Sequence, residues 1–111
     1  HGVEAGGRPW FNIAKSAEMV LMNNLSIKKE FVRNGITFNS VAPGNVMIPD
    51  TGWDEIRKSS PNFNSVLDQY PMGKMGVPED IASLVTFLCS EKASYINGAS
   101  IVVDGGQSHV F

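Results

Sequence analysis

Two short β-strand patterns, separated by a long mixed segment, constrain the fold of this chain more than any other feature. Ile36–Ala42 reads as the first strand, and Ala99–Asp104 is a near-continuous apolar strand of the kind that is typically buried on both faces of a parallel sheet. A sheet of two strands leaves one edge of each strand unpaired and cannot cover both of its faces. We therefore expect the sheet to be incomplete without further strands.

Longer helical patterns precede both strands. From Trp10 to Arg33 apolar residues recur at steps of three and four, and Asn34-Gly35 supplies the left-handed residue that commonly ends a helix. This helix carries two apolar stripes, so it requires two packing neighbours, which we expect to be the parent sheet and a partner subunit. A second helix is predicted to begin at Pro78, because proline suits the first helical position.

The segment 45–77 joins the first strand to the second long helix. It contains two short helical patterns, one after Thr51 and one opened by Ser60-Pro61. Connections of this length in compact domains usually act as lids or binding loops, so we expect this segment to close over a substrate. Its apolar and aromatic side chains predict a pocket with some apolar surface, lined by Trp53, Phe63, Tyr70 and Met72.

Helix, strand, lid, helix and strand in this order indicate an α/β fold with a parallel sheet and a right-handed crossover. We expect residues 1–111 to form one partial domain, the second half of a larger doubly wound domain. The start of the chain at His1, in place of a methionine, agrees with that expectation.

Composition and charge exclude several classes of function. Nine basic and eleven acidic residues give a formal net charge of -2 without a long run of either sign, so we expect neither nucleic acid nor a membrane as a partner. The single cysteine cannot form an internal disulfide, which favours a reducing compartment such as the cytoplasm. Asp50, Asp54 and Glu55 have no nearby histidine or cysteine, so we expect no metal site there.

Two short stretches are candidates for binding or catalysis. In WFNIAK, Phe11 and Lys15 lie four residues apart and would project side by side from one helix face, as a catalytic pair does. Phenylalanine has no hydrogen-bonding group, so an ordinary helix start remains the alternative. Pro43-Gly44 lies at the carboxyl end of a strand, where ligands bind in open α/β sheets, and a simple turn is the alternative there.

Three separated motifs together resemble one family. FNIAKSA, NSVAPGNV and KMGVPEDIASLVTFLCSEKASYINGASIVVDGG resemble, in order and spacing, the C-terminal half of a short-chain dehydrogenase/reductase of the 3-oxoacyl-(acyl carrier protein) reductase type. The resemblance extends from Pro9 to Gly106. It implies the C-terminal part of a Rossmann-like, doubly wound parallel sheet that is incomplete without its N-terminal half.

The resemblance implies catalytic roles on the first helix. Lys15 matches the family lysine that binds the nicotinamide ribose hydroxyls and lowers the pKa of a neighbouring tyrosine. A nearby ammonium group favours the phenolate, so this effect has an electrostatic basis. The tyrosine itself, the general acid that protonates the substrate oxygen, falls on Phe11. The family serine and asparagine would lie upstream of His1.

The resemblance also implies cofactor contacts after the first strand. Pro43-Gly44 matches the turn after the sixth strand of the family, and Val46 matches the residue whose backbone holds the nicotinamide carboxamide. Ile48 falls where the family commonly has a cofactor-contacting threonine, and it brings no hydroxyl group. The segment 45–77 matches the substrate loop, whereas the glycine-rich pyrophosphate turn is not among these residues.

The resemblance thus favours an NAD(P)-dependent oxidoreductase that transfers hydride between nicotinamide and a carbonyl or alcohol substrate. NAD and NADP both remain open, because the residues that read the ribose 2′ position follow the second strand of such folds. Expected partners are a small-molecule substrate, the N-terminal half of the domain and further copies in a homodimer or homotetramer. The alternative is a catalytically impaired relative or fragment, with Phe11 in place of the acid, that acts by oligomerisation or ligand binding. Tyr70 is the phenol that could replace the missing acid.

Overall fold

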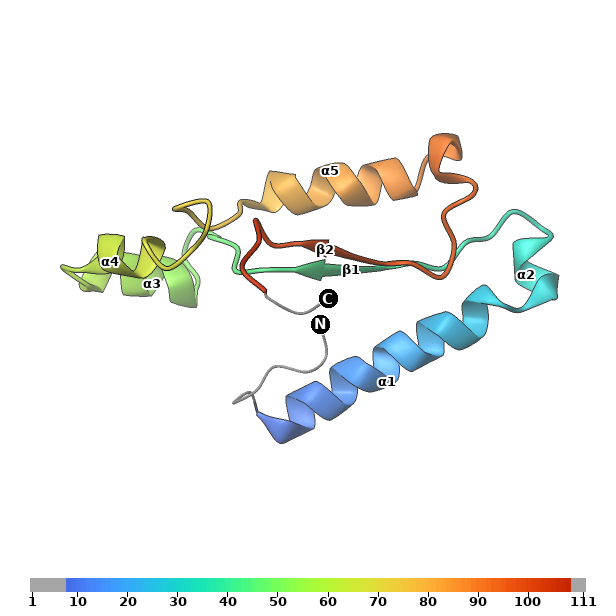
Figure 1. The fold of residues 1–111 in the computed structure, drawn as a ribbon, viewed down its shortest axis with the longest axis horizontal. Coiled ribbons are helices and arrows are strands. Elements are labelled where there is room, and N and C mark those ends of the chain that lie inside the picture. Colours follow the sequence, from blue (N-terminus) through green and yellow to red (C-terminus); the bar gives the residue numbers. More distant parts are fainter. Residues whose placement is uncertain (1–7, 109–111) are drawn as a thin grey trace. The chain divides into compact units, whose positions relative to one another are not determined.

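The computed structural model describes residues 8–108, which form six helices and two strands (Figure 1). By contacts the chain divides into a first unit of residues up to 42 with 86–101, and a second unit of residues 43–85 with those from 102 onward. The elements are α1 (Pro9–Ser26), α2 (Lys29–Val32), β1 (Ser40–Pro43), α3 (Gly52–Ser59), α4 (Phe63–Leu67), α5 (Pro78–Leu88), the 3-10 helix η1 (Glu91–Ala93) and β2 (Ser100–Val103).

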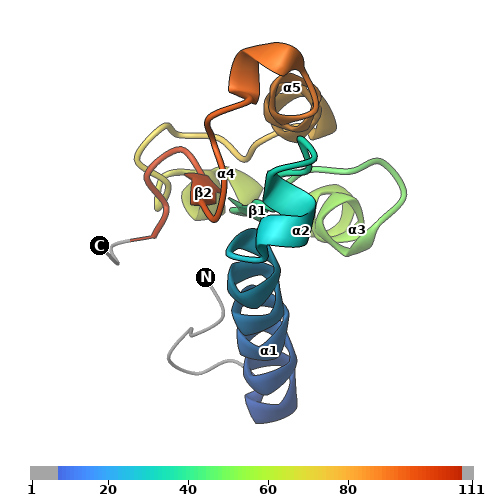
Figure 2. The same ribbon diagram turned by 90° about the vertical axis from the view of Figure 1, so that its right-hand side faces the viewer.

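The first helical pattern forms two helices and not the single predicted one. α1 ends at Ser26, and α2 follows as a separate short helix at its C-terminal end (Figure 2). The Ser26 carbonyl accepts a hydrogen bond from Asn97 Nδ2 at 2.7 Å, so a distant side chain takes the acceptor that a continuing helix would use. Gly35, at φ 80°, follows α2 as the predicted left-handed residue.

Asparagine side chains define where the first strand begins. The Phe38 N–H donates to Asn97 Oδ1 at 3.0 Å, and the side chain of Asn39 both donates to and accepts from the backbone of residues 96–99. These bonds replace part of a regular ladder, so β1 begins at Ser40 and the prediction of a strand from Ile36 was wrong at its start.

Strands β1 and β2 form a two-stranded sheet (Figure 1). The Ser40 N–H donates to the Ala99 carbonyl and the Gly44 N–H to the Val103 carbonyl, each at 2.9 Å. Because the residue numbers rise together in the two pairs, the strands are parallel, as predicted. β2 alternates between exposed and half-buried residues, and Val102 is 37% exposed, so burial on both faces is wrong within the described residues.

The second unit contains the two short helices that were expected in the segment 45–77. α3 confirms the first, whereas α4 begins at Phe63, so Pro61 is not its first residue as predicted. Pro61 instead lies in the turn before the helix. α5 begins at Pro78 as predicted, and the Asp80 carboxylate accepts the Val77 N–H at 2.9 Å, which satisfies a backbone donor at the start of the helix.

A buried carboxylate ties α3 to the residue before it. Asp54 is 3% exposed, and its oxygens accept hydrogen bonds from Lys58 Nζ at 2.8 Å, from the Asp50 N–H at 2.9 Å and from Arg57 Nε at 2.9 Å. Lys58, the Asp50 N–H and Arg57 together hold the pKa of Asp54 well below its ordinary value. Asp54 therefore has a structural role, and these contacts with cations leave it no metal-binding role.

Replacing Asp54 by asparagine will make the stability of the full-length protein less dependent on acid pH. The pKa of Asp54 is lower in the folded than in the unfolded state, so its contribution is complete above about pH 5 and is lost progressively as the pH falls further. We expect the difference in melting temperature between wild type and Asp54→Asn to shrink between about pH 6 and about pH 3. The exposed Glu55, changed to glutamine, is the control on the same helix. A difference that stays constant over this range would contradict the prediction.

Few apolar side chains are buried. Within residues 8–108 the buried apolar residues are Phe63, Met75 and Ala93. On α1, Trp10 is 63% exposed and Ile13 is 71% exposed. So much exposed apolar surface is unusual for a complete domain, and it agrees with the prediction of a partial one.

Candidate functional site

Phe11 and Lys15 lie side by side on α1, as their spacing predicts. Lys15 Nζ lies 5.7 Å from the centroid of the Phe11 ring, within cation–π range. The same ammonium group forms an ion pair with Glu18 Oε2 at 2.9 Å, which the sequence did not reveal. The Lys15 side chain is 45% exposed, so this pair is weakly held and the ammonium group can donate further hydrogen bonds.

The turn after β1 requires glycine for a packing reason. A Cβ atom on Gly44 would lie 2.6 Å from Asp104 Cβ and 2.9 Å from Asp104 Cα, closer than carbon atoms approach one another. The backbone after β2 is therefore one neighbour that demands glycine here. The close approach places the start of the segment 45–77 against the end of β2.

Val46 presents an unused hydrogen-bond donor and acceptor. It forms an isolated parallel bridge with Gly76, in which the Gly76 N–H donates to the Asn45 carbonyl at 3.0 Å and the Met47 N–H donates to the Gly76 carbonyl at 2.8 Å. The N–H and C=O of Val46 therefore point away from Gly76, and neither has a hydrogen-bond partner among residues 8–108. A free donor and a free acceptor on one residue are complementary to a planar primary amide.

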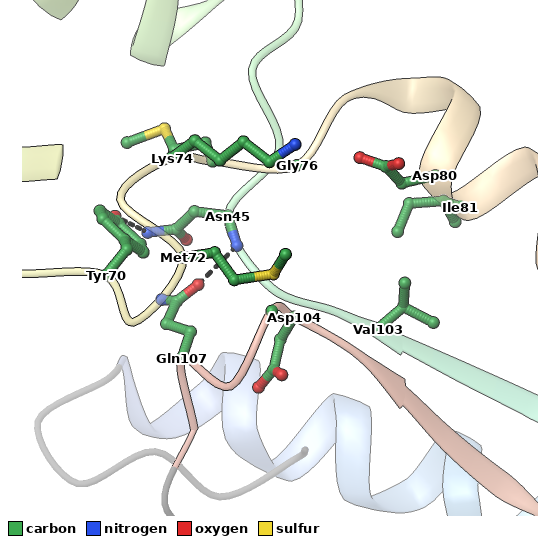
Figure 3. Close-up of a pocket in the computed structure, with 12 residues that line it drawn as sticks. Asn45, Tyr70, Met72, Lys74, Gly76, Asp80, Ile81, Val103, Asp104 and Gln107 are labelled. Atoms are coloured by element: carbon green, nitrogen blue, oxygen red, sulfur yellow. Dashed lines mark hydrogen bonds between the residues drawn. The ribbon is translucent and has the colours of Figure 1, made fainter.

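Asn45 and Gln107 bring the two strand ends of the second unit together. The Asn45 N–H donates to Gln107 Oε1 at 2.8 Å, and Asn45 Nδ2 donates to Tyr70 Oη at 2.6 Å (Figure 3). Neither asparagine nor glutamine was predicted as a site residue. Their positions in the sequence could have identified them as site residues, because Asn45 directly follows Pro43-Gly44 and Gln107 directly follows the glycine pair after β2.

A cavity of about 260 Å³ opens beside these residues in the second unit. Of the four residues predicted to line a pocket, Tyr70 and Met72 line this cavity, whereas Trp53 and Phe63 are not among its lining residues, and Phe63 is buried. The lining, seen in part in Figure 3, consists of Asn45, Tyr70, Met72, Lys74, Met75, Gly76, Asp80, Ile81, Val103, Asp104, Gly105 and Gln107.

Asp104 stabilises the turn that carries Gln107. Its carboxylate accepts hydrogen bonds from the Ser108 hydroxyl at 2.6 Å, the Ser108 N–H at 2.8 Å and the Gly106 N–H at 2.9 Å. The hydroxyl bond, followed by the two backbone bonds, lowers the pKa of Asp104 below its ordinary value. Because these donors occupy the carboxylate, Asp104 acts as a support and not as an acid or base.

The predicted site residues fall in both units. Phe11 and Lys15 belong to the first unit, and Pro43, Gly44, Val46 and Ile48 belong to the second. Ile48 is 44% exposed, and its carbonyl accepts the Thr51 hydroxyl at 2.7 Å. No group of three metal-binding side chains is found in the part of the chain that the structure describes.

The likeness to known proteins covers nearly the whole chain. A family model described as enoyl-(acyl carrier protein) reductase matches residues 2–108. A crystal structure of an oxidoreductase of the short-chain dehydrogenase/reductase family from Burkholderia thailandensis matches 96% of this chain and 41% of its own, with a TM-score of 0.78 and 34% identity. The chain belongs to the short-chain dehydrogenase/reductase family. The predicted fold, the C-terminal part of a Rossmann-like α/β domain, is thereby confirmed.

Two further relatives of this family member have named activities. The (3R)-3-hydroxyacyl-CoA dehydrogenase of Canis lupus familiaris is 40% identical over 95 residues, which are 86% of this chain and 35% of that protein. L-Sorbose reductase of Gluconobacter frateurii, solved with NADPH and L-sorbose, is 30% identical with a TM-score of 0.79 over 96% of this chain and 43% of its own. The chain thus spans about two fifths of the length of these relatives.

No helix within residues 8–108 combines the length and the apolar character that crossing a membrane requires.

Proposed function

We propose that the protein carrying this chain is an NAD(P)-dependent oxidoreductase that interconverts a carbonyl and an alcohol. Family membership supports this, as do relatives named as a 3-hydroxyacyl-CoA dehydrogenase and as a reductase solved with NADPH. The structural observation that carries the proposal is the backbone of Val46, whose N–H and C=O are both directed away from Gly76 and are free to bind a carboxamide.

Each predicted site residue has a part in this function. The Lys15 ammonium group binds the ribose hydroxyls, and Val46 holds and orients the nicotinamide ring through its carboxamide. Pro43-Gly44 positions Val46, and Ile48 offers the cofactor an apolar contact where a hydroxyl would otherwise be. When bound, the reduced nicotinamide supplies hydride to the carbonyl carbon. The segment 45–77 closes over the substrate and excludes water.

The proposed function also requires parts of the protein beyond these residues and further copies of it. The N-terminal half of the complete domain, which these residues do not include, supplies the further strands, the glycine-rich pyrophosphate turn and the family serine. The exposed apolar side chains of α1, Trp10 and Ile13 among them, support a homo-oligomer, a dimer or a tetramer. The single cysteine supports a cytoplasmic location.

One observation favours a second candidate, an impaired relative that binds ligands or oligomerises without turnover. Phe11 stands at the tyrosine position and has no proton to give. Loss of a positioned general acid costs about 10²–10⁴ in rate, so such a protein would bind cofactor and reduce carbonyls very slowly unless another group supplies the proton.

The proposal is tested by titrating the full-length protein with NADPH and NADH, followed by assay of cofactor oxidation with ethyl acetoacetate as a carbonyl probe. Val46→Pro removes the backbone donor and also fixes the backbone φ angle at this position, and we expect it to weaken cofactor binding by at least about 2- to 10-fold. Val46→Ala keeps the N–H and serves as the matched control. Absence of any cofactor binding would overturn the proposal, and binding without oxidation would favour the impaired relative.

A further inference from the structure

Gln107 belongs to a tightly held turn after β2. Its own N–H donates to the Asp104 carbonyl at 3.0 Å, and the Asp104 carboxylate accepts the N–H groups of Gly106 and Ser108, the residues on either side of Gln107. Gly105 and Gly106 have φ angles of 59° and 81°, in the left-handed region that glycine adopts without strain. The backbone is therefore fixed on both sides of Gln107, so its side chain starts from a defined position.

The side chain of Gln107 extends from this turn to the residue that follows Pro43-Gly44 (Figure 3). Gln107 Oε1 accepts the Asn45 N–H at 2.8 Å. A Cβ atom on Gly44 would lie 2.7 Å from the same Oε1 atom, so the absence of a side chain at Gly44 leaves the space that this acceptor occupies. Gln107 and Asn45 are both half-buried, and the bond satisfies a backbone donor that would otherwise need another partner. Gln107 thus ties Asn45 to the end of β2.

Asn45 sets the orientation of the backbone groups of Val46. The peptide between these two residues is planar and trans, so the Val46 N–H points opposite to the Asn45 carbonyl, which accepts the Gly76 N–H at 3.0 Å. The preceding peptide plane carries the Asn45 N–H and is held by Gln107. Only the φ and ψ angles of Asn45 lie between the two bonded planes, so the two bonds together fix the direction of the Val46 N–H.

The bonds to Gln107 and to Gly76 connect Asn45 to different parts of the second unit. Gly76 lies near the far end of the segment 45–77, which we propose to close over the substrate. Gln107 lies shortly after β2, outside that segment. When the segment moves, the bond to Gln107 therefore still holds the residue before Val46 against the end of β2.

We propose that Gln107 is a positioning residue for the nicotinamide cofactor. Its side-chain carbonyl holds the Asn45 backbone and thereby keeps the N–H and C=O of Val46 directed at the carboxamide. This inference rests on the proposed function, and every contact that carries it lies within the second unit. Because Gln107 acts through Asn45 and Val46, its loss lowers the affinity for the nicotinamide part of the cofactor and leaves the affinity for the other parts unchanged.

Binding of the cofactor and of a fragment without nicotinamide to the full-length protein tests the role of Gln107. NADPH carries the nicotinamide ring, whereas 2′-phospho-ADP-ribose lacks the ring and keeps the rest of the molecule. NADH and ADP-ribose form the corresponding pair if NADH binds more tightly. We expect Gln107→Leu to weaken NADPH binding by about 2- to 10-fold, the loss of one hydrogen bond, and to leave the affinity for the fragment unchanged.

Two further variants identify the atom and the position responsible. Gln107→Glu keeps an oxygen acceptor on a side chain of the same length, and we expect it to bind NADPH as tightly as the wild type does. Gln69, the other glutamine of the chain, is exposed, so Gln69→Leu is the matched control and should leave both affinities unchanged.

The outcomes separate the role of Gln107 from the proposed function. If Gln107→Leu weakens the binding of NADPH and of the fragment equally, Gln107 has only a structural role, and its positioning role is overturned. Unchanged binding of both ligands by Gln107→Leu would overturn it as well, as would NADPH binding by Gln107→Glu that is as weak as that by Gln107→Leu. Each of these results leaves the proposed function standing. A wild-type protein that binds neither NADPH nor NADH would overturn both.

Discussion

Replacing Lys15 by methionine in the full-length protein will weaken NADPH binding by about 10- to 100-fold, since hydrogen bonds to a charged group contribute about 1.5–3 kcal/mol. Methionine keeps the apolar stem of the side chain and removes only the ammonium group, which we propose to bind the ribose hydroxyls. Lys15 is 45% exposed and makes one surface ion pair, so the fold loses little by the change. Equilibrium titration with NADPH gives the affinity, and the melting temperature verifies folding.

Glu18→Gln separates the two roles of Lys15. It removes the ion pair of 2.9 Å and leaves the ammonium group in place, so we expect a stability change within about 0.5 kcal/mol and no loss of cofactor affinity. If Lys15→Met and Glu18→Gln bind NADPH equally well, Lys15 does not contact the cofactor, and its match to the family motif has no functional meaning here.

Changing Gly44 to alanine will destabilise the full-length protein by about 1–3 kcal/mol, because overpacking forces neighbouring backbone to move. The new Cβ would lie 2.6 Å from Asp104 Cβ and 2.9 Å from Asp104 Cα, and a backbone atom cannot rotate away. In a domain of this family's size we expect the melting temperature to fall by about 3–10 °C. Cofactor affinity should fall as well, since displacement of Gly44 also moves Val46.

Gly52→Ala is the matched control for this substitution. Gly52 is the first residue of α3, and nothing lies within 4 Å of the Cβ that alanine would add there. We expect its stability change to remain within about 0.5 kcal/mol or to be slightly favourable. Equal melting temperatures for wild type, Gly44→Ala and Gly52→Ala would show that the turn after β1 tolerates a side chain, contrary to the packing seen at Asp104.

The order of the elements was accessible from local patterns, but their boundaries were not. Periodic apolar residues indicated α1 and α5, and Pro78 marked the start of α5 correctly. The end of α1 at Ser26 depends on Asn97, which is remote in the sequence, and the start of β1 at Ser40 depends on the same side chain. A local pattern carries no information on a bond between residues so far apart in the chain.

In the candidate site, too, local contacts could be predicted from the sequence and contacts between distant residues could not. The spacing of Phe11 and Lys15 on one helix determines their contact, because four residues make about one helical turn. The pairing of Val46 with Gly76 and of Asn45 with Tyr70 joins residues about 25 to 30 positions apart, so spacing did not predict it. The same holds for Trp53 and Phe63, whose apolar character suggested a pocket but which do not line the cavity of the second unit.

The sequence by itself determined the class of fold, the need for further strands and, through three ordered motifs, the family. These properties depend on local periodicity and on residue types that the chain carries wherever it folds. Tertiary structure alone decided that Gly44 is required by Asp104, that Val46 keeps a free donor and acceptor, and that the Tyr70 hydroxyl accepts a hydrogen bond from Asn45. Each of these depends on a contact between distant residues, and such contacts exist only once the chain is folded.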